Sequence, residues 1–159
     1  MPHPDQRRSP RAALTLIDLI VTMLVIGVMG AVAAPRFSAM MNHYRVSAAA
    51  GRLQADLEYA RRQAQTQGRP QSVVFDGSAN RYELPDSPHP DRPGTKYVVE
   101  LSSAAAGVAL KSAAFESGAS AVTYDLYGRP DAAGAVVLAA GVEQRTIRVD
   151  GTSGRVTVE

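Results

Sequence analysis

One stretch near the start of the chain decides the fold: residues 14–34 read LTLIDLIVTMLVIGVMGAVAA. The run is apolar apart from two threonines, one aspartate and two glycines. As a helix it would span about 31 Å, which is enough to cross the hydrocarbon core of a bilayer. The pattern therefore predicts a membrane-spanning helix over residues 14–34.

The residues before this stretch, 1–13, contain three prolines and three arginines and show no apolar periodicity. They predict a solvated basic leader. Arg7, Arg8 and Arg11 against Asp5 account for the whole formal net charge of +2. By the positive-inside rule the N-terminus should stay in the cytoplasm, and the chain after Ala34 should be exported across the inner membrane.

After Ala34 the sequence keeps a helical period but becomes amphipathic. Apolar residues recur every three or four positions between Phe37 and Ala64, and arginines and acidic residues fill the opposite face. Gln67-Gly68, with Pro70 just beyond, is typical of a helix end. We expect one helix from Leu14 to about Gln67, kinked near Pro35, with residues 35–68 as its amphipathic part.

After Gly68 the apolar period changes to two, which predicts strands. The expected strands are Ser72–Phe75, Arg81–Leu84, Lys96–Leu101, Val108–Leu110, Ala121–Tyr124, Ala135–Leu138, Thr146–Val149 and Arg155–Val158. Pro85–Gly94 contains four prolines and is expected to form an exposed loop. The fold class is therefore α+β: residues 69–159 form a β-rich globular region with one antiparallel sheet, and Val46–Ala64 of the helix packs across that sheet.

Asp18 is the unusual residue of the apolar run. A carboxylate deep in a bilayer costs about 2.5–3.5 kcal/mol, so it requires a cation or a position near the interface. If the chain is cut between Ala13 and Leu14, the new α-amino group is such a cation. Asp18 of one subunit would then pair with the amine of a neighbour, and this pair would set the register of packed helices.

These residues resemble the type IV prepilin signal, in which a basic leader precedes an apolar helix that begins like Phe-Thr-Leu-Ile-Glu-Leu. Thr15-Leu16-Ile17 match directly, while Ala13, Leu14 and Asp18 stand where the family usually has Gly, Phe and Glu. Pro35 lies where many pilins have a helix-kinking proline. The resemblance implies cleavage after Ala13 by a prepilin peptidase, methylation of Leu14, and assembly with other pilins or pseudopilins.

The rest of the chain resembles the GspH/FimT group of minor pseudopilins. The resemblance is carried by Leu53–Arg61 leading into Gly68-Arg69-Pro70, by the turn Tyr127–Pro130, and by Gly154-Arg155-Val156 near the end. It implies a minor subunit of a type II secretion pseudopilus or a type IV pilus, anchored in the inner membrane and then taken into the filament.

Two other interpretations of the apolar run remain open. In the first, it is a secretory signal peptide, and Ala31-Val32-Ala33 is the cleavage site that releases a soluble binding domain after Ala33. In the second, it is a plain single-pass anchor. The length of the run disfavours the first, and neither explains Asp18.

DNA binding is a further alternative that the resemblance permits, since related minor pilins are implicated in DNA uptake. The candidate phosphate contacts are Arg145, Arg148 and Arg155, although Glu143, Asp150 and Glu159 offset their charge. We expect no enzyme: the sequence nominates no catalytic, cofactor-binding or metal-binding residues. Cysteine is absent, and His3, His43 and His89 have no metal-site spacing.

Overall fold

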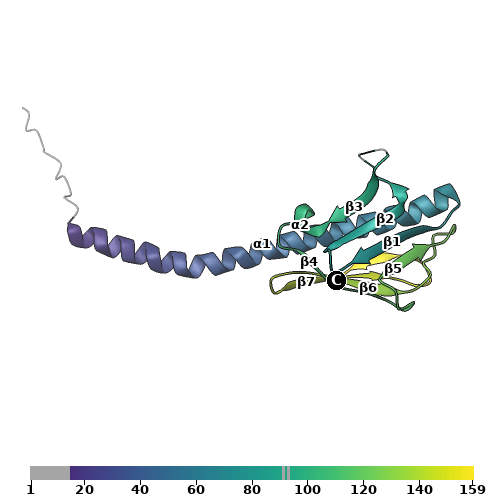
Figure 1. Ribbon diagram of the computed structural model, residues 1–159. Helices are drawn as coiled ribbons and strands as arrows, with labels where there is room; N and C mark the ends of the chain where they lie inside the picture. Colours follow the sequence, from purple (N-terminus) through teal and green to yellow (C-terminus); the bar gives the residue numbers. More distant parts are fainter. Residues whose placement is uncertain (1–14, 91, 93) are drawn as a thin grey trace, which may run out of the picture. The chain divides into compact units, whose positions relative to one another are not determined.

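The computed structural model describes residues 15–90, 92 and 94–159, and Figure 1 labels its elements except β8. In chain order these are α1 (Leu16–Gln67), β1 (Gln71–Asp76), β2 (Arg81–Pro88), β3 (Lys96–Glu100), α2 (Leu101–Ala104), β4 (Ala109–Phe115), β5 (Ala121–Tyr124), β6 (Gly134–Ala140), β7 (Glu143–Val149) and β8 (Val156–Val158). The chain divides into two compact units. One ends at Phe37, and the other, Ser38–Glu159, is called the head unit below.

Helix α1 contributes to both units and confirms the expectation of one long helix. It ends where predicted, at Gln67, because Gly68 adopts a left-handed φ of 61° and stops the helix. Leu14, the expected first residue, lies outside the described residues. Pro35 lies within α1, but its side chain is outside the described part of the chain, so the kink stays a prediction.

The head unit contains two antiparallel sheets, so the expectation of a single sheet was wrong. One sheet has the order β3-β2-β1-β5 and the other β4-β6-β7-β8. Strand β4 does not pair with β5, which follows it in the chain. Instead β5 joins β1 in the register Val73↔Val122, and β4 pairs with β6. Figure 1 shows β3, β2, β1 and β5 following one another in this order.

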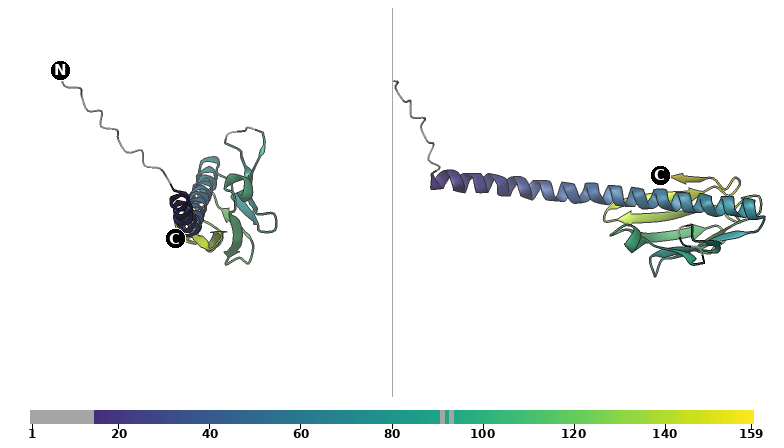
Figure 2. Two further views of the ribbon diagram at one scale, coloured as in Figure 1. Left: turned by 90° about the vertical axis from the view of Figure 1, so that its left-hand side faces the viewer. Right: turned by 90° about the horizontal axis from the view of Figure 1, so that it is seen from above.

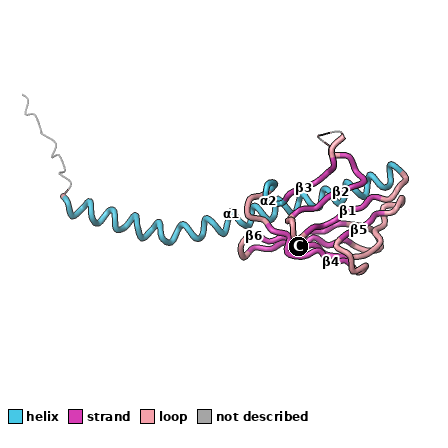
Figure 3. The backbone as a smooth tube through the Cα atoms, viewed as in Figure 1, coloured by secondary structure: helices cyan, strands magenta, loops and turns pink. Residues whose placement is uncertain are grey.

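The core of the head unit forms between α1 and the inner faces of both sheets. Figures 2 and 3 show the strands alongside the last part of α1. The helix contributes a buried stripe of small and branched side chains: Val46, Ala49, Ala50, Leu53, Leu57, Ala60 and Ala64. Strand residues alternate between core and surface, as in β1, where Val73 and Phe75 are buried. The predicted packing of Val46–Ala64 against a sheet is confirmed.

The predicted loop Pro85–Gly94 is partly strand, because β2 continues to Pro88. The pairing of β2 with β3 shifts register between Leu84 and Pro88. Prolines are tolerated at such an irregularity because fewer ladder bonds require a backbone N–H there. The N–H of Ser72 on β1 donates to the Asp86 carboxylate, 3.1 Å away, rather than to a backbone carbonyl.

The other strand boundaries differ by a few residues. Strand β3 stops at Glu100, and Leu101 begins the short helix α2, where it is buried. Strand β4 begins at Ala109 rather than Val108 and extends to Phe115. Strands β6 and β7 are likewise longer than expected, while β8 is confined to Val156–Val158.

Polar contacts fix α1 on both sheets. Asp56 is buried and accepts hydrogen bonds from the hydroxyls of Tyr82, at 2.5 Å, and Tyr97, at 2.6 Å. Burial and the nearby carboxylate raise the pKa of both phenols above the ordinary tyrosine range. On the other sheet, the Gln54 amide donates to the carbonyl of Val156 at 3.0 Å. The helix therefore holds the two sheets together.

Candidate functional site

The start of α1 is a capping box built by Thr15 and Asp18. The Thr15 backbone N–H and hydroxyl both donate to Oδ2 of Asp18, at 3.2 and 2.8 Å. In return, the Asp18 N–H donates to the Thr15 hydroxyl at 3.3 Å. The Thr-x-x-Asp spacing satisfies free donors of the first helical turn, and the carboxylate lies at the positive end of the helix dipole.

Asp18 therefore has a hydrogen-bond partner within its own chain, Thr15, which we did not predict from the sequence. Both bonds from Thr15 end on Oδ2, and no hydrogen bond from a described residue ends on Oδ1. A cation can therefore approach Oδ1 while the cap stays intact. Ala13 and Leu14 lie outside the described residues, so cleavage between them and the pairing of Asp18 with a new amine stay predictions.

The apolar part of α1 has no cover from the described chain. Between Leu16 and Met29, all the large apolar side chains are about half or more exposed. Among the described residues, α1 is the one helix long and apolar enough to cross a membrane. A signal sequence near an N-terminus meets the same criterion, so this observation alone does not separate an anchor from a cleaved signal.

The three arginines proposed for DNA contact do not form one cluster. On β7, Arg145 has the same parity as the buried Ile147, whereas Arg148 points to the outer face. Arg148 is held by Glu159, with Nε 2.9 Å from the carboxylate. Arg155 lies in the loop before β8 and lines one open groove together with Arg148. Glu116 and Asp150 line the same groove, so its charge is mixed.

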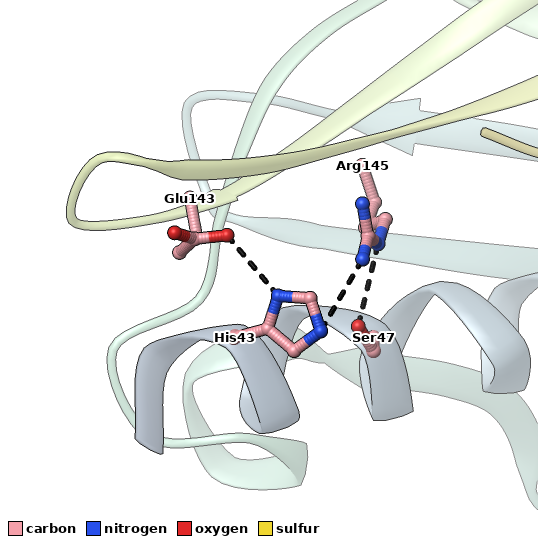
Figure 4. Close-up of polar contacts among 4 residues, drawn as sticks. All are labelled: His43, Ser47, Glu143 and Arg145. Carbon is pink, nitrogen blue, oxygen red and sulfur yellow. Dashed lines mark hydrogen bonds and ion pairs between the residues drawn. The ribbon is translucent and has the colours of Figure 1, made fainter. Parts of the chain in front are cut away.

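Arg145 instead belongs to a polar cluster that joins β7 to α1 (Figure 4). Its Nε donates to the Ser47 hydroxyl at 3.3 Å, and its terminal nitrogen lies 3.4 Å from Nε2 of His43. Nδ1 of His43 lies 3.2 Å from the Glu143 carboxylate. The cluster therefore fastens the β6–β7 hairpin to the first helical turns of the head unit.

No group of three His, Asp or Glu side chains able to hold a metal occurs among the residues described here. The polar clusters of the head unit connect elements to one another, as the Asp56 and His43 clusters do. The described part of the head unit thus offers contacts that hold its own elements together, and the apolar part of α1 is suited to packing in a membrane or against other helices.

Residues 49–154, more than half of the chain, match the family described as type II transport protein GspH. The chain belongs to the GspH family. The resemblance inferred from the sequence is thereby confirmed, and it is confirmed by residues of the head rather than by the apolar run.

One curated relative of this GspH-family chain is the type II secretion system protein H of Xanthomonas campestris pv. campestris. The two are 30% identical over 95 residues, which is 58% of this chain and 56% of the relative. The chain thus matches little more than half the length of that protein.

Two solved structures share the fold. The type IV minor pilin FimU of Pseudomonas aeruginosa superposes with a TM-score of 0.54 at 18% identity, over 72% of this chain and 87% of FimU. The minor pseudopilin EpsH from the type 2 secretion system of Vibrio cholerae gives 0.56 at 13% identity, over 72% and 96%. The pilin-like α+β fold class is confirmed, and the relatives are named as secretion or pilus subunits rather than enzymes.

Sequence reasoning missed two features of these sites. The capping box was visible as Thr-x-x-Asp before an apolar run, a known signal for a helix start. The Asp56–Tyr82–Tyr97 cluster gave no local signal, because its members are brought together by the pairing of β2 with β3 and the docking of α1.

Proposed function

We propose that this GspH-family chain is a minor pseudopilin that is anchored by its apolar helix and then assembled, through that helix, with other pilin-type subunits. One observation carries the proposal: the uncovered apolar segment and the buried stripe of the head are parts of the same helix, α1. A helix whose first part has its large apolar side chains exposed in the isolated chain needs lipid or neighbouring helices to cover it.

The maturation step of the proposal is cleavage by a prepilin peptidase between Ala13 and Leu14, followed by methylation of Leu14. The leader would stay in the cytoplasm, and the head would face the outside of the inner membrane. Mass spectrometry of the mature protein tests this. A start at methyl-Leu14 supports the proposal, a start at Ala34 replaces it with a released soluble domain, and an uncut chain replaces it with a plain anchor.

In the assembly step Asp18 has two roles: it caps the helix by accepting hydrogen bonds from Thr15, and it forms an ion pair with the α-amino group of a neighbouring subunit. Two substitutions separate them. Asp18→Ala removes both, whereas Thr15→Val removes the cap hydroxyl and keeps the carboxylate. We expect Asp18→Ala to impair filament assembly strongly while membrane insertion persists, and Thr15→Val to have a small effect. An equal defect in both would show that capping alone explains the role of Asp18.

The relatives belong to two machines, type II secretion and type IV pili. We place the chain in a secretion pseudopilus because the matching family is named for type II transport and the curated relative for type II secretion. Deleting the gene should then block export of secreted enzymes and leave surface pili intact. Loss of pili with normal secretion would assign the chain to the pilus instead.

DNA binding is the weaker alternative. Arg148 and Arg155 line one groove, which favours it, but Arg145 faces α1 and Arg148 is already paired with Glu159. If DNA binds by phosphate contact, affinity should fall steeply with salt and with Arg148→Ala and Arg155→Ala, but not with Arg145→Ala. Absence of salt-sensitive binding would remove this alternative.

A further inference from the structure

Three segments of the head unit that are distant in sequence meet near the end of α1. They are the last turns of α1, the turn Asp125–Gly128 after β5, and the loop Asp150–Gly154 between β7 and β8. Arg61 on α1 donates to the carbonyl of Gly128 at 3.2 Å, and Gln65 donates to the carbonyl of Tyr127 at 2.9 Å. The two loops also touch, because a Cβ placed on Gly154 would lie 2.5 Å from the Gly128 carbonyl oxygen.

The turn between β5 and β6 is held rigidly. Oδ1 of Asp125 accepts the backbone N–H groups of Tyr127, at 2.9 Å, and Arg129, at 2.8 Å. The N–H of Gly128 donates to the Asp125 carbonyl at 2.8 Å. These bonds hold the turn in shape and leave Leu126 and Tyr127 exposed, with 70% of Tyr127 accessible to solvent. A large aromatic side chain on a preorganised turn loses little freedom on binding.

A cleft of about 360 Å³ lies beside this turn, lined by Glu58, Arg61, Arg62, Gln65 and Arg155. Three of these five side chains are cationic and one is anionic. Glu58 is a distant partner for Arg62, at 3.9 Å, and both are well exposed. Arg61 is engaged with the Gly128 carbonyl. Within the described chain, no hydrogen bond or ion pair is found for the guanidinium of Arg155, so the cleft carries excess positive charge.

We propose that a surface made of the turn Asp125–Gly128 (the Tyr127 turn) and the cleft beside it (the arginine cleft) binds an acidic segment of a neighbouring pilin-type subunit. One carboxylate of that segment enters the arginine cleft, and an apolar residue next to it packs on Tyr127. The inference rests on the proposed assembly function and names the chemistry of one contact in it. Arg155 and Arg62 would supply a forked pair of donors to the carboxylate. Tyr and Arg are also the residues that most often dominate the energy of protein interfaces.

A single carboxylate fits this surface better than a nucleic acid. A phosphate backbone needs a track of positive charge along several successive phosphates. Here the excess charge is confined to one cleft that already contains Glu58, and the adjoining segments carry Asp125, Asp131 and Asp150. A protein segment that presents one acidic and one apolar group requires no such track.

Photo-crosslinking of the full chain tests the inference in cells that express the complete set of pilin subunits. A benzophenone amino acid replaces Tyr127 in one strain and Val25, within the apolar helix, in another. We expect the probe at 127 to link to a peptide of another pilin-type subunit that contains Asp or Glu. Arg155→Glu should lower that yield about tenfold, while the control Lys111→Glu on β4 leaves it unchanged. Replacing the partner's carboxylate by lysine should restore the link to the Arg155→Glu chain.

The two probes separate this inference from the function on which it rests. Links from residue 25 without links from 127 would leave the assembly function standing and overturn the docking surface. Absence of both would overturn the two together. Links from 127 to nucleic acid, or to a pilin peptide without an acidic residue, would also contradict the inference. Arg155→Gln gives a second, milder variant that reduces the yield only in part if the charge matters.

Discussion

At the scale of single residues, Asp56 shows how a polar side chain specifies the position of a helix. It is buried in the helical stripe and accepts hydrogen bonds from two tyrosines on neighbouring strands. Apolar residues at α1's other core positions would tolerate a small rotation of the helix, whereas two short directional bonds do not. The contact therefore sets which residues of α1 face outwards and where its last turns meet the loops.

Replacing this carboxylate should destabilise the head. Asp56→Ala leaves the hydroxyls of Tyr82 and Tyr97 buried without a partner, which costs about 2–4 kcal/mol. Urea unfolding of the full chain in detergent, followed by circular dichroism, measures the change. The control is Glu58→Ala two residues later, which removes only the exposed pair with Arg62 and should cost less than about 1 kcal/mol. Equal losses in both variants would contradict the special role of Asp56.

The buried tyrosines also predict alkaline instability. Burial raises the pKa of Tyr82, Tyr97 and Tyr124 above the ordinary 10.0, so the folded state holds its phenolic protons more tightly than the unfolded state. Their contribution is complete below pH 10.0 and falls as the pH rises above it. We expect the urea midpoint to drop as the pH rises from about 10 to about 12, and to drop less in Tyr82→Phe. A midpoint independent of pH in this window would refute the assignment.

At the scale of elements, the sequence predicted what depends on local period and punctuation. The strand Ala121–Tyr124 was predicted to the residue, and the helix ends at Gln67, where its end was approximately predicted. The pairing of the strands could not be predicted from the sequence, because β1 pairs with β5 although β2, β3 and β4 lie between them in the chain. The continuation of β2 through Pro85 was also hidden, since it depends on Asp86 accepting the Ser72 N–H in place of a ladder bond.

The contact between two loops yields a prediction at this scale. Gly154 has a left-handed φ of 66°, and an added Cβ would lie 2.5 Å from a backbone oxygen of the other loop. Gly154→Ala therefore combines backbone strain with a clash and should cost about 2–4 kcal/mol. Gly68→Ala is the matched control, with a φ of 61° but open space around it, and should cost about 1 kcal/mol. Comparable thermal shifts for both variants would show that the loops separate at little cost.

At the scale of the whole molecule, some of the candidate sites could be predicted from the sequence and others could not. Asp18 and the apolar run were visible because a carboxylate in an apolar stretch is locally anomalous. The arginine cleft was not, because Arg62 and Arg155 are brought together only when the β7–β8 loop reaches α1. The head carries the family match and the helix carries the anchoring proposal, so the two parts need separate tests.

The anchoring proposal predicts that one charge placed within the apolar part of α1 weakens membrane insertion. Leu24→Arg puts a guanidinium near the middle of the segment and should raise the insertion free energy by about 2.5–3.5 kcal/mol. The share of full-length chain that alkaline carbonate extracts from membranes should rise accordingly. Ala48→Arg is the matched control, because residue 48 is an exposed position of the same helix within the head unit. If Leu24→Arg is extracted no more readily than Ala48→Arg, the segment does not lie in the bilayer, and the uncovered surface of α1 must be covered by protein alone.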